Sequence, residues 1–166
     1  MTLRAWRLMI GSSDTAMRLL TVLCGLLALV MIFDAARCWF GVSVGLWAAA
    51  LAASAPTLVE LSLQVRNYVP MLAMMSLAMA ALARIDVAGR NWRRLLSLGG
   101  GIFAAMLTHY FAVGACVAVL VYGTFSLRGE ARRAVLVALG TAALLYAAMW
   151  GPQLLRQRTN FDLNRG

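Results

Sequence analysis

Charged residues are scarce in this sequence. Asp, Glu, Lys and Arg make up 13% of its 166 residues, only six are acidic, and lysine is absent altogether. A soluble globular domain is about half apolar and a quarter charged, whereas this chain is 63% hydrophobic with a mean hydropathy of +0.81. This composition excludes an ordinary water-soluble domain, and it excludes intrinsic disorder, which requires low hydrophobicity. The remaining class is an integral membrane protein.

Cysteine is also sparse. The sequence has three cysteines, which is an odd number, and no two of them form a Cys-x-x-Cys pair; they are Cys24, Cys38 and Cys116. This pattern argues against a disulfide framework or a zinc site. We therefore expect three small buried residues. No cofactor is expected, and a divalent metal stays open as an alternative that no residue indicates. The N-terminus is not a signal peptide, because its apolar run Leu8–Ile10 is too short.

Six apolar stretches separate short polar segments. Several are shorter than the roughly 20 residues that an untilted helix needs to cross a bilayer, so flanking Arg and Trp side chains must extend them to the interface. Backbone groups in lipid need internal partners, and the stretches do not alternate as barrel strands do, so helices are predicted. The stretches are Met17–Phe33, Phe40–Ala55, Val69–Ala83, Leu95–Leu107, Tyr110–Leu127 and Ala134–Trp150.

The predicted fold is therefore an all-α membrane protein with about six short transmembrane helices. We expect one domain over 1–166, with an N-terminal interfacial helix at 1–15, six spans within 16–151 and an extracytoplasmic tail at 152–166. Small residues at three- and four-residue spacings favour a closely packed bundle. The polar break Thr108-His109 is expected to form the tip of a tight helical hairpin, because 95–127 would be about 50 Å long as one helix.

The arginines predict the orientation. Loops one, three and five hold eight of them, whereas loops two and four hold only Arg66. Short cytoplasmic loops are rich in Lys and Arg, so loops one, three and five are expected in the cytoplasm and both termini outside, which suggests a further span upstream. Arginines grouped between apolar runs do not indicate nucleic-acid binding, which calls for a basic face with interleaved aromatics.

Polar residues gather on the predicted outer side. They occur in Pro56–Tyr68, in Thr108–Phe111 and in Leu3–Arg18. Arg, Tyr and His side chains at headgroup depth suit an anionic lipid head, and a guanidinium such as that of Arg66 binds phosphate with two parallel hydrogen bonds. Glu60 and Asp14 are the nearby carboxylates, and Asp14 is expected to cap a helix.

These segments resemble membrane glycosyltransferases of the GT-C type. Pro56–Tyr68 is similar to the family segment "SP…YYSQEARMY", with the same spacing from the proline to Arg66 and Tyr68. The similarity continues through Trp92-Arg93-Arg94, through Thr108-His109-Tyr110-Phe111, which is similar to the family's "THYF", and through Trp150-Gly151-Pro152. The family comprises polyprenyl- or dolichyl-phosphate-sugar-dependent enzymes related to protein mannosyltransferases and aminoarabinose transferases.

The resemblance implies an activity and a set of roles. It implies transfer of a sugar from a polyprenyl-phosphate carrier to an extracytoplasmic acceptor, by an integral protein of the bacterial inner membrane whose site faces the periplasm. It leaves the sugar and the acceptor open. The donor would be bound by residues on the outer side, namely Arg66, Tyr68, Gln64, His109 and Tyr110.

This sequence departs from the family pattern at the acidic residues. The family base lies in a first extracytoplasmic loop upstream of the matched part, and Gln64 stands where "QEAR" has its acid. An amide cannot accept a proton as a carboxylate does, so no catalytic residue is assigned and this chain alone is expected to be inactive. Two other classes stay open, a multi-span transporter or channel component and a non-catalytic membrane scaffold.

Overall fold

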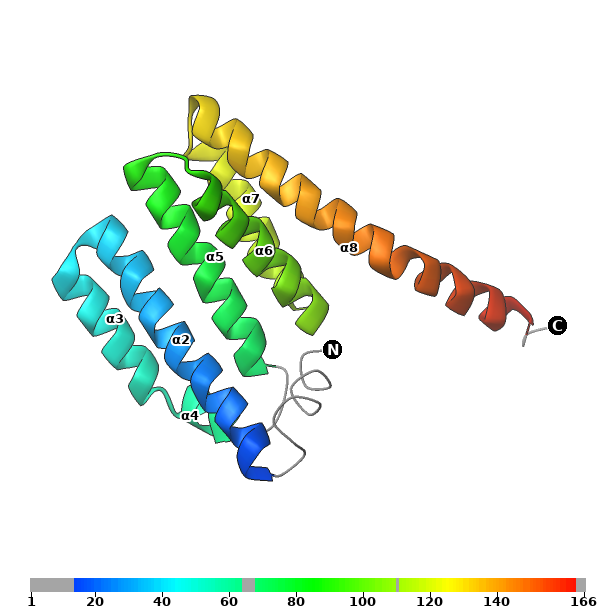
Figure 1. Cartoon of the computed structure of the whole chain (residues 1–166), viewed down its shortest axis with the longest axis horizontal. Coiled ribbons are helices and arrows are strands. Elements are labelled where there is room, and N and C mark those ends of the chain that lie inside the picture. The colour runs from blue at the N-terminus through cyan, green and yellow to red at the C-terminus, as the bar shows by residue number, and fades with distance from the viewer. Residues whose placement is uncertain (1–13, 64–67, 110, 164–166) are drawn as a thin grey trace.

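The computed structural model describes residues 14–63, 68–109 and 111–163, and all regular structure in these residues is helical. The helices follow one another along the chain with short connections (Figure 1). They are α2 (Asp14–Phe40), α3 (Val42–Ser54), α4 (Pro56–Leu63), α5 (Tyr68–Ala88), α6 (Trp92–Thr108), α7 (Ala112–Phe125) and α8 (Gly129–Leu163). The predicted all-α membrane class is confirmed.

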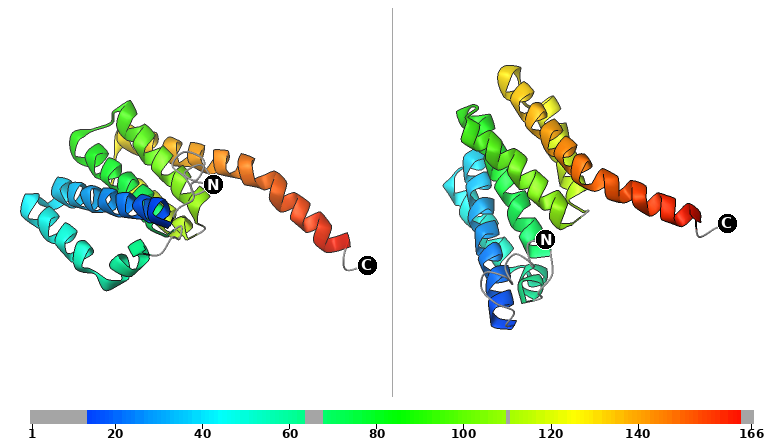
Figure 2. Two further views of the ribbon diagram at one scale, coloured as in Figure 1. Left: turned by 60° about the horizontal axis from the view of Figure 1, so that its bottom comes forward. Right: turned by 45° about the vertical axis from the view of Figure 1, so that its right-hand side comes forward.

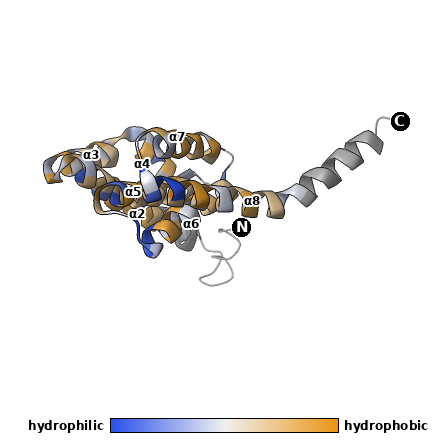
Figure 3. Ribbon diagram, turned by 90° about the horizontal axis from the view of Figure 1, so that it is seen from above, coloured by the Kyte–Doolittle hydropathy of each residue, from blue (hydrophilic) through white to orange (hydrophobic). Residues whose placement is uncertain are grey.

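Three helices are long and apolar enough to cross a membrane. They are Arg18–Phe40 in α2, Tyr68–Ala88 in α5 and Gly129–Gly151 in α8, whereas α3 and α7 are shorter apolar helices. Figure 3 shows hydrophobic residues along most of their length. Side chains such as Trp47 and Leu144 are more than two-thirds exposed, as expected of residues that face lipid instead of water.

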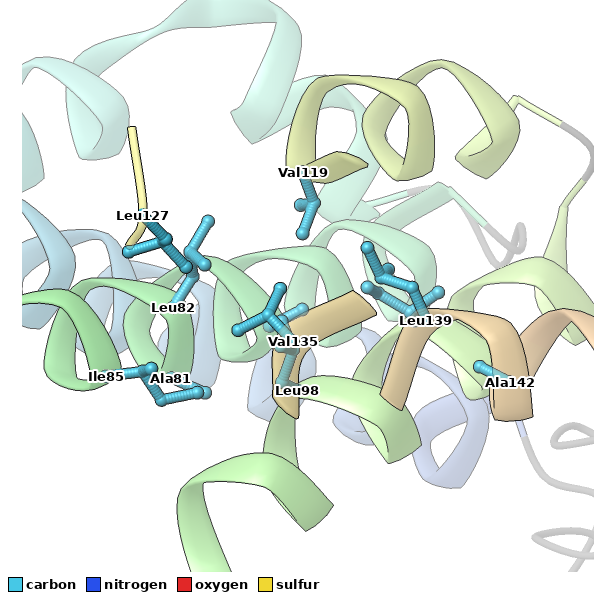
Figure 4. Close-up of a cluster of buried hydrophobic side chains, with 11 residues drawn as sticks. Ala81, Leu82, Ile85, Leu98, Val119, Leu127, Val135, Leu139 and Ala142 are labelled. Carbon is cyan, nitrogen blue, oxygen red and sulfur yellow. The ribbon is translucent and has the colours of Figure 1, made fainter. Parts of the chain in front are cut away.

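Helix α5 is the centre of the bundle. Half of its spanning segment is buried, and it packs against α2 on one side and α6 on the other. The main core joins α5, α6, α7 and α8 through fully buried side chains, among them Leu82, Leu98, Val119 and Val135 (Figure 4). By contrast only 11% of the α8 spanning segment is buried, and α8 runs away from the other helices toward its C-terminal end (Figure 1 and Figure 2).

The connections have identifiable causes. Gly41 separates α2 from α3 with φ 94°, and Gly89 ends α5 with φ 76°, conformations that a side chain disfavours. The Asn91 side chain then caps α6 by accepting a hydrogen bond from the Arg93 N–H at 3.1 Å. Arg94 donates to the terminal carbonyls of α5, at 2.8 Å from that of Ala88. Side chains close in sequence thus form hydrogen bonds with the backbone groups at the end of α5 and the start of α6.

The first helix is longer than the sequence predicts. The expected span ended at Phe33 with Arg37 in a loop, but α2 continues to Phe40 and contains both Asp34 and Arg37. The extension is stabilised by ion pairs, because the Asp34 carboxylate contacts Arg37 at 2.6 Å and Arg84 of α5 at 2.7 Å. Likewise, α8 continues past Trp150 to Leu163, so the segment expected as a tail is helical over 152–163.

Three further predictions concern the segment from Pro56 to Tyr68, the N-terminus and the cysteines. The segment expected as a loop from Pro56 to Tyr68 contains the helix α4, which starts with a proline at its first position, where the missing N–H costs nothing. The interfacial helix expected at 1–15 lies almost entirely outside the described residues. The three cysteines are free thiols within helices, and they are half-buried, so the expectation that all three are buried is wrong.

Glycine allows α5 and α6 to approach closely. A Cβ on Gly101 would lie 2.8 Å from the Met74 carbonyl oxygen and 3.2 Å from the Ala78 nitrogen, both in the α5 backbone. A Cβ on the neighbouring Gly100 would meet nothing within 4 Å. Small residues at helix interfaces permit such contact in membranes, so the expected close packing is confirmed at Gly101.

We predict that Gly101→Ala destabilises the bundle by about 1 to 3 kcal/mol, the usual cost of overpacking. The helix would have to move away from a backbone that cannot rotate aside. Thermal unfolding in detergent micelles measures the effect. Gly100→Ala is the matched control and should leave the unfolding temperature unchanged or raise it, since Ala favours a helix over Gly. Equal unfolding temperatures for the two variants would contradict the packing argument.

Candidate functional site

Several of the aromatic and polar residues named above lie at one end of the bundle. Helix α4, the start of α5 and the turn between α6 and α7 lie at this end, which we call the hairpin end (Figure 1). The turns 40–41, 89–91 and 126–128 lie at the opposite end, called here the arginine end. The predicted hairpin at Thr108-His109 is confirmed, because α6 ends at Thr108 and α7 begins at Ala112.

Two predicted site residues meet at the hairpin end. The ring of Tyr68, the first residue of α5, lies 4.9 Å from the ring of His109, with 37° between the planes. His109 is the C-cap of α6, so the contact follows from the packing of α5 on α6. Centroid separations of 4.5–7 Å are those of favourable ring pairs. The fold therefore brings together two motifs that are distant in sequence.

His109 is held on several sides. Its backbone is extended, with φ −158° and ψ 139°, and its N–H donates to the Ala105 carbonyl at 3.0 Å. The Phe111 ring stacks on the imidazole at 5.0 Å with 18° between the planes. The Phe111 N–H donates to Nδ1 at 3.3 Å. A neutral imidazole that accepts at Nδ1 carries its proton on Nε2, which makes Nε2 a hydrogen-bond donor.

Most of the remaining candidate residues cannot be placed. Gln64, Arg66 and Tyr110 lie outside the described residues. Glu60 is exposed on α4. Phe111 was part of the motif Thr108–Phe111 but received no role from the sequence. The stacking of Phe111 on His109 depends on the geometry of the turn. The only signal for this contact in the sequence is that the motif contains aromatic residues.

The residue that follows Tyr68 lines a small cleft. The cleft has a volume of about 160 Å³ and lies between α2, α3, α4 and α5. Its lining is apolar and includes Leu26, Leu29, Leu58 and Val69, and Val69 is the residue after Tyr68. Neither Tyr68 nor His109 lines this cleft, so the aromatic pair and the apolar cleft are separate features joined by the start of α5.

The arginine end differs in character because it holds a buried carboxylate between two arginines. Asp34 is 4% exposed and lies six residues before the end of α2. Its contact with Arg84 Nε is an ion pair at 2.7 Å without the direction of a hydrogen bond, whereas Arg37 donates to its other oxygen at 2.6 Å. A buried carboxylate requires such partners. This cluster joins α2 to α5 and offers no unpaired charge within the spans.

A second cluster joins three helices at the arginine end. The Asp86 carboxylate of α5 accepts a hydrogen bond from Trp39 Nε1 of α2 at 3.1 Å and one from the Tyr122 hydroxyl of α7 at 2.5 Å. The rings of Trp39 and Tyr122 also lie 5.5 Å apart. These bonds stabilise the helix ends and give the arginine end a structural role.

No metal centre is visible in the part of the chain that the structure describes, since no three His, Cys, Asp or Glu side chains lie close enough to share an ion. The Tyr68–His109 pair is the candidate site, because it is where the fold brings two of the predicted site residues together. Aromatic rings and an N–H donor at the end of spanning helices suit a ligand with an anionic head and an apolar tail.

This architecture, a helical bundle with three helices long enough to span a membrane, agrees with the comparison with known families. The family model for dolichyl-phosphate-mannose-protein mannosyltransferases matches residues 2–151. The chain belongs to that family, whose members are membrane glycosyltransferases of the GT-C type. No curated protein matched the chain, and no solved structure did.

We predict that Asp34→Asn lowers the free energy of unfolding by about 1 to 3 kcal/mol. Breaking a buried ion pair costs about 3–5 kcal/mol, and the value is reduced here because Arg37 and Arg84 are nearly half exposed. Unfolding in detergent measures the change. Glu130→Gln, which breaks the exposed pair with Arg90 at 2.8 Å, is the control and should have no measurable effect. Equal effects of the two substitutions would refute the structural role of Asp34.

Proposed function

We propose that this chain binds the sugar donor of a GT-C-type glycosyltransferase, which moves a sugar from a polyprenyl-phosphate carrier to an extracytoplasmic acceptor. The observation that carries the proposal is the contact between Tyr68 and His109 at 4.9 Å. It unites the two segments that are most similar to the family motifs, and it does so at the end of the spanning helices. The name of the family supports a donor of the dolichyl-phosphate-sugar class.

The chemistry of the donor explains these residue types. Departure of a sugar from a lipid phosphate needs positive charge and hydrogen-bond donors near the phosphate. We assign the guanidinium of Arg66, two residues before Tyr68, to bidentate binding of that phosphate. His109 contributes the Nε2 proton. Tyr68, Gln64 and Tyr110 complete the proposed donor-binding set.

The apolar part of the donor also needs a surface. The cleft of about 160 Å³ beside Val69 can accept the isoprene units nearest the phosphate, because apolar groups gain free energy on leaving water. More distant units would lie against lipid-facing side chains. An anionic head at the rim and an apolar chain along the helices give the donor the depth that membrane interfaces impose.

We assign no residue of this set to proton transfer. The acceptor hydroxyl needs a base, and Gln64 cannot supply one. Binding of the donor and catalysis of the transfer are therefore separate claims. A non-catalytic donor-binding scaffold would bind polyprenyl phosphate as strongly and transfer nothing.

The orientation belongs to the same proposal. Eight arginines lie at or near the arginine end, from Arg37 to Arg133, and Lys and Arg are enriched on the cytoplasmic side of membrane proteins. The hairpin end then faces the exterior, the periplasm in the case of a bacterial inner membrane. The acceptor of an extracytoplasmic transfer reaches the membrane from that side.

The test is equilibrium binding of radiolabelled polyprenyl phosphate to the full chain in nanodiscs. Arg66→Ala should weaken binding about ten- to a hundredfold, because charge-assisted hydrogen bonds contribute about 1.5–3 kcal/mol each. His109→Ala should weaken it less, by about tenfold. Tyr68→Phe should retain most of the affinity, since it keeps the ring that contacts His109, whereas Tyr68→Ala should not.

Arg132→Ala is the matched control, since it removes one arginine at the opposite end. Its affinity should equal that of the unmodified chain. If Arg132→Ala and Arg66→Ala weakened binding equally, the attraction would be general electrostatics and the proposed site would be wrong.

A further inference from the structure

A groove between α6 and α8 lies apart from the donor site. Its volume is about 650 Å³, within the 300–1,000 Å³ of sites for single small ligands. The walls are mostly apolar, with Leu96 and Phe103 on α6 and Val137 and Leu145 on α8. Arg90, Glu130 and Arg133 line it as well, and they lie at the arginine end.

Glycine keeps the groove open. A Cβ on Gly99 would lie 3.5 Å from the Ala138 carbonyl oxygen of α8, in ordinary contact, whereas one on Gly100 would meet nothing within 4 Å. The two helices therefore touch near Gly99 and leave space beside Gly100. A large side chain at Gly100 would occupy that space without displacing the backbone.

The length of the groove matches one leaflet of a bilayer. Along the α8 wall, Leu145 lies twelve residues after Arg133, which is a rise of about 18 Å at 1.5 Å per residue. Half of a hydrocarbon core is about 15 Å. A chain that starts at the arginines thus ends near the middle of the membrane.

The charges at the mouth favour an anion. Arg90 is paired with Glu130 at 2.8 Å. Arg133 is exposed, and its side chain has no acidic partner among the described residues. The mouth therefore carries one uncompensated positive charge where the apolar wall begins.

We propose that the groove binds an anionic phospholipid of the leaflet at the arginine end, with one acyl chain between α6 and α8 and the phosphate beside Arg133. Volume, length and charge all fit this occupant. A further helix would fit the apolar wall but would leave the charge of Arg133 unmatched. The inference is independent of the proposed donor site, which lies at the other end of the helices.

Photolabelling tests the proposal. The full chain is placed in phosphatidylcholine nanodiscs with a trace of phosphatidylglycerol that carries a diazirine at the end of one acyl chain, and labelled residues are mapped by mass spectrometry. Label should concentrate near Phe103 and Leu145. The same probe with a phosphatidylcholine head should label these residues at least fivefold less, and Arg133→Gln should remove most of that preference.

The variant Gly100→Leu tests whether the acyl chain needs the space in the groove. It should lower labelling near Phe103 and Leu145 at least fivefold, because its side chain fills the groove. Gly114→Leu is the control, since a Cβ on that α7 glycine also meets nothing within 4 Å and it does not line the groove. Thermal unfolding verifies that both variants fold.

Three outcomes would overturn the proposal. They are equal labelling by the two headgroups, labelling that Gly100→Leu leaves unchanged, and cross-linking of Leu145 to a second copy of the chain in place of lipid. The last outcome would identify the groove as a helix-docking surface.

Discussion

The close approach of α5 and α6 at Gly101 is the constraint on which the rest of the bundle depends. At this glycine the α6 backbone lies directly against that of α5, with no room for even a methyl group. The contact fixes the separation of the two helices about two turns from His109 and about the same distance from Tyr68. The aromatic pair is therefore a consequence of backbone packing. A membrane protein gains little from burying apolar side chains away from lipid, so such van der Waals contacts carry much of the specificity.

The two ends of the bundle are held together by different interactions. At the arginine end, buried Asp34 and exposed Asp86 join neighbouring helices through ion pairs and hydrogen bonds, and these contacts hold the helices in register. At the hairpin end, His109 is positioned by rings and by its own backbone. The two ends thus differ in the interactions that hold them: carboxylate contacts at the arginine end and ring contacts at the hairpin end.

Much of this arrangement could be predicted from the sequence, because lipid imposes strong rules. The helical class follows from the apolar runs, and the hairpin follows from a polar break at His109 in a run too long for one crossing. The extension of α2 through Arg37 could not be predicted, since it depends on the pairing of Asp34 with Arg84, 50 residues further along the chain. The stacking of Phe111 on His109 depends on the geometry of a three-residue turn, which hydropathy does not encode.

The central claim is that helix packing at Gly101 creates the donor site at the hairpin end. The most direct test is the affinity of polyprenyl phosphate for Gly101→Ala, measured at a temperature at which the variant is folded. The account predicts clearly weaker binding, although Gly101 lies about two turns from the proposed site, while Gly100→Ala binds as the unmodified chain does. Unchanged affinity in a destabilised but folded Gly101→Ala protein would contradict it.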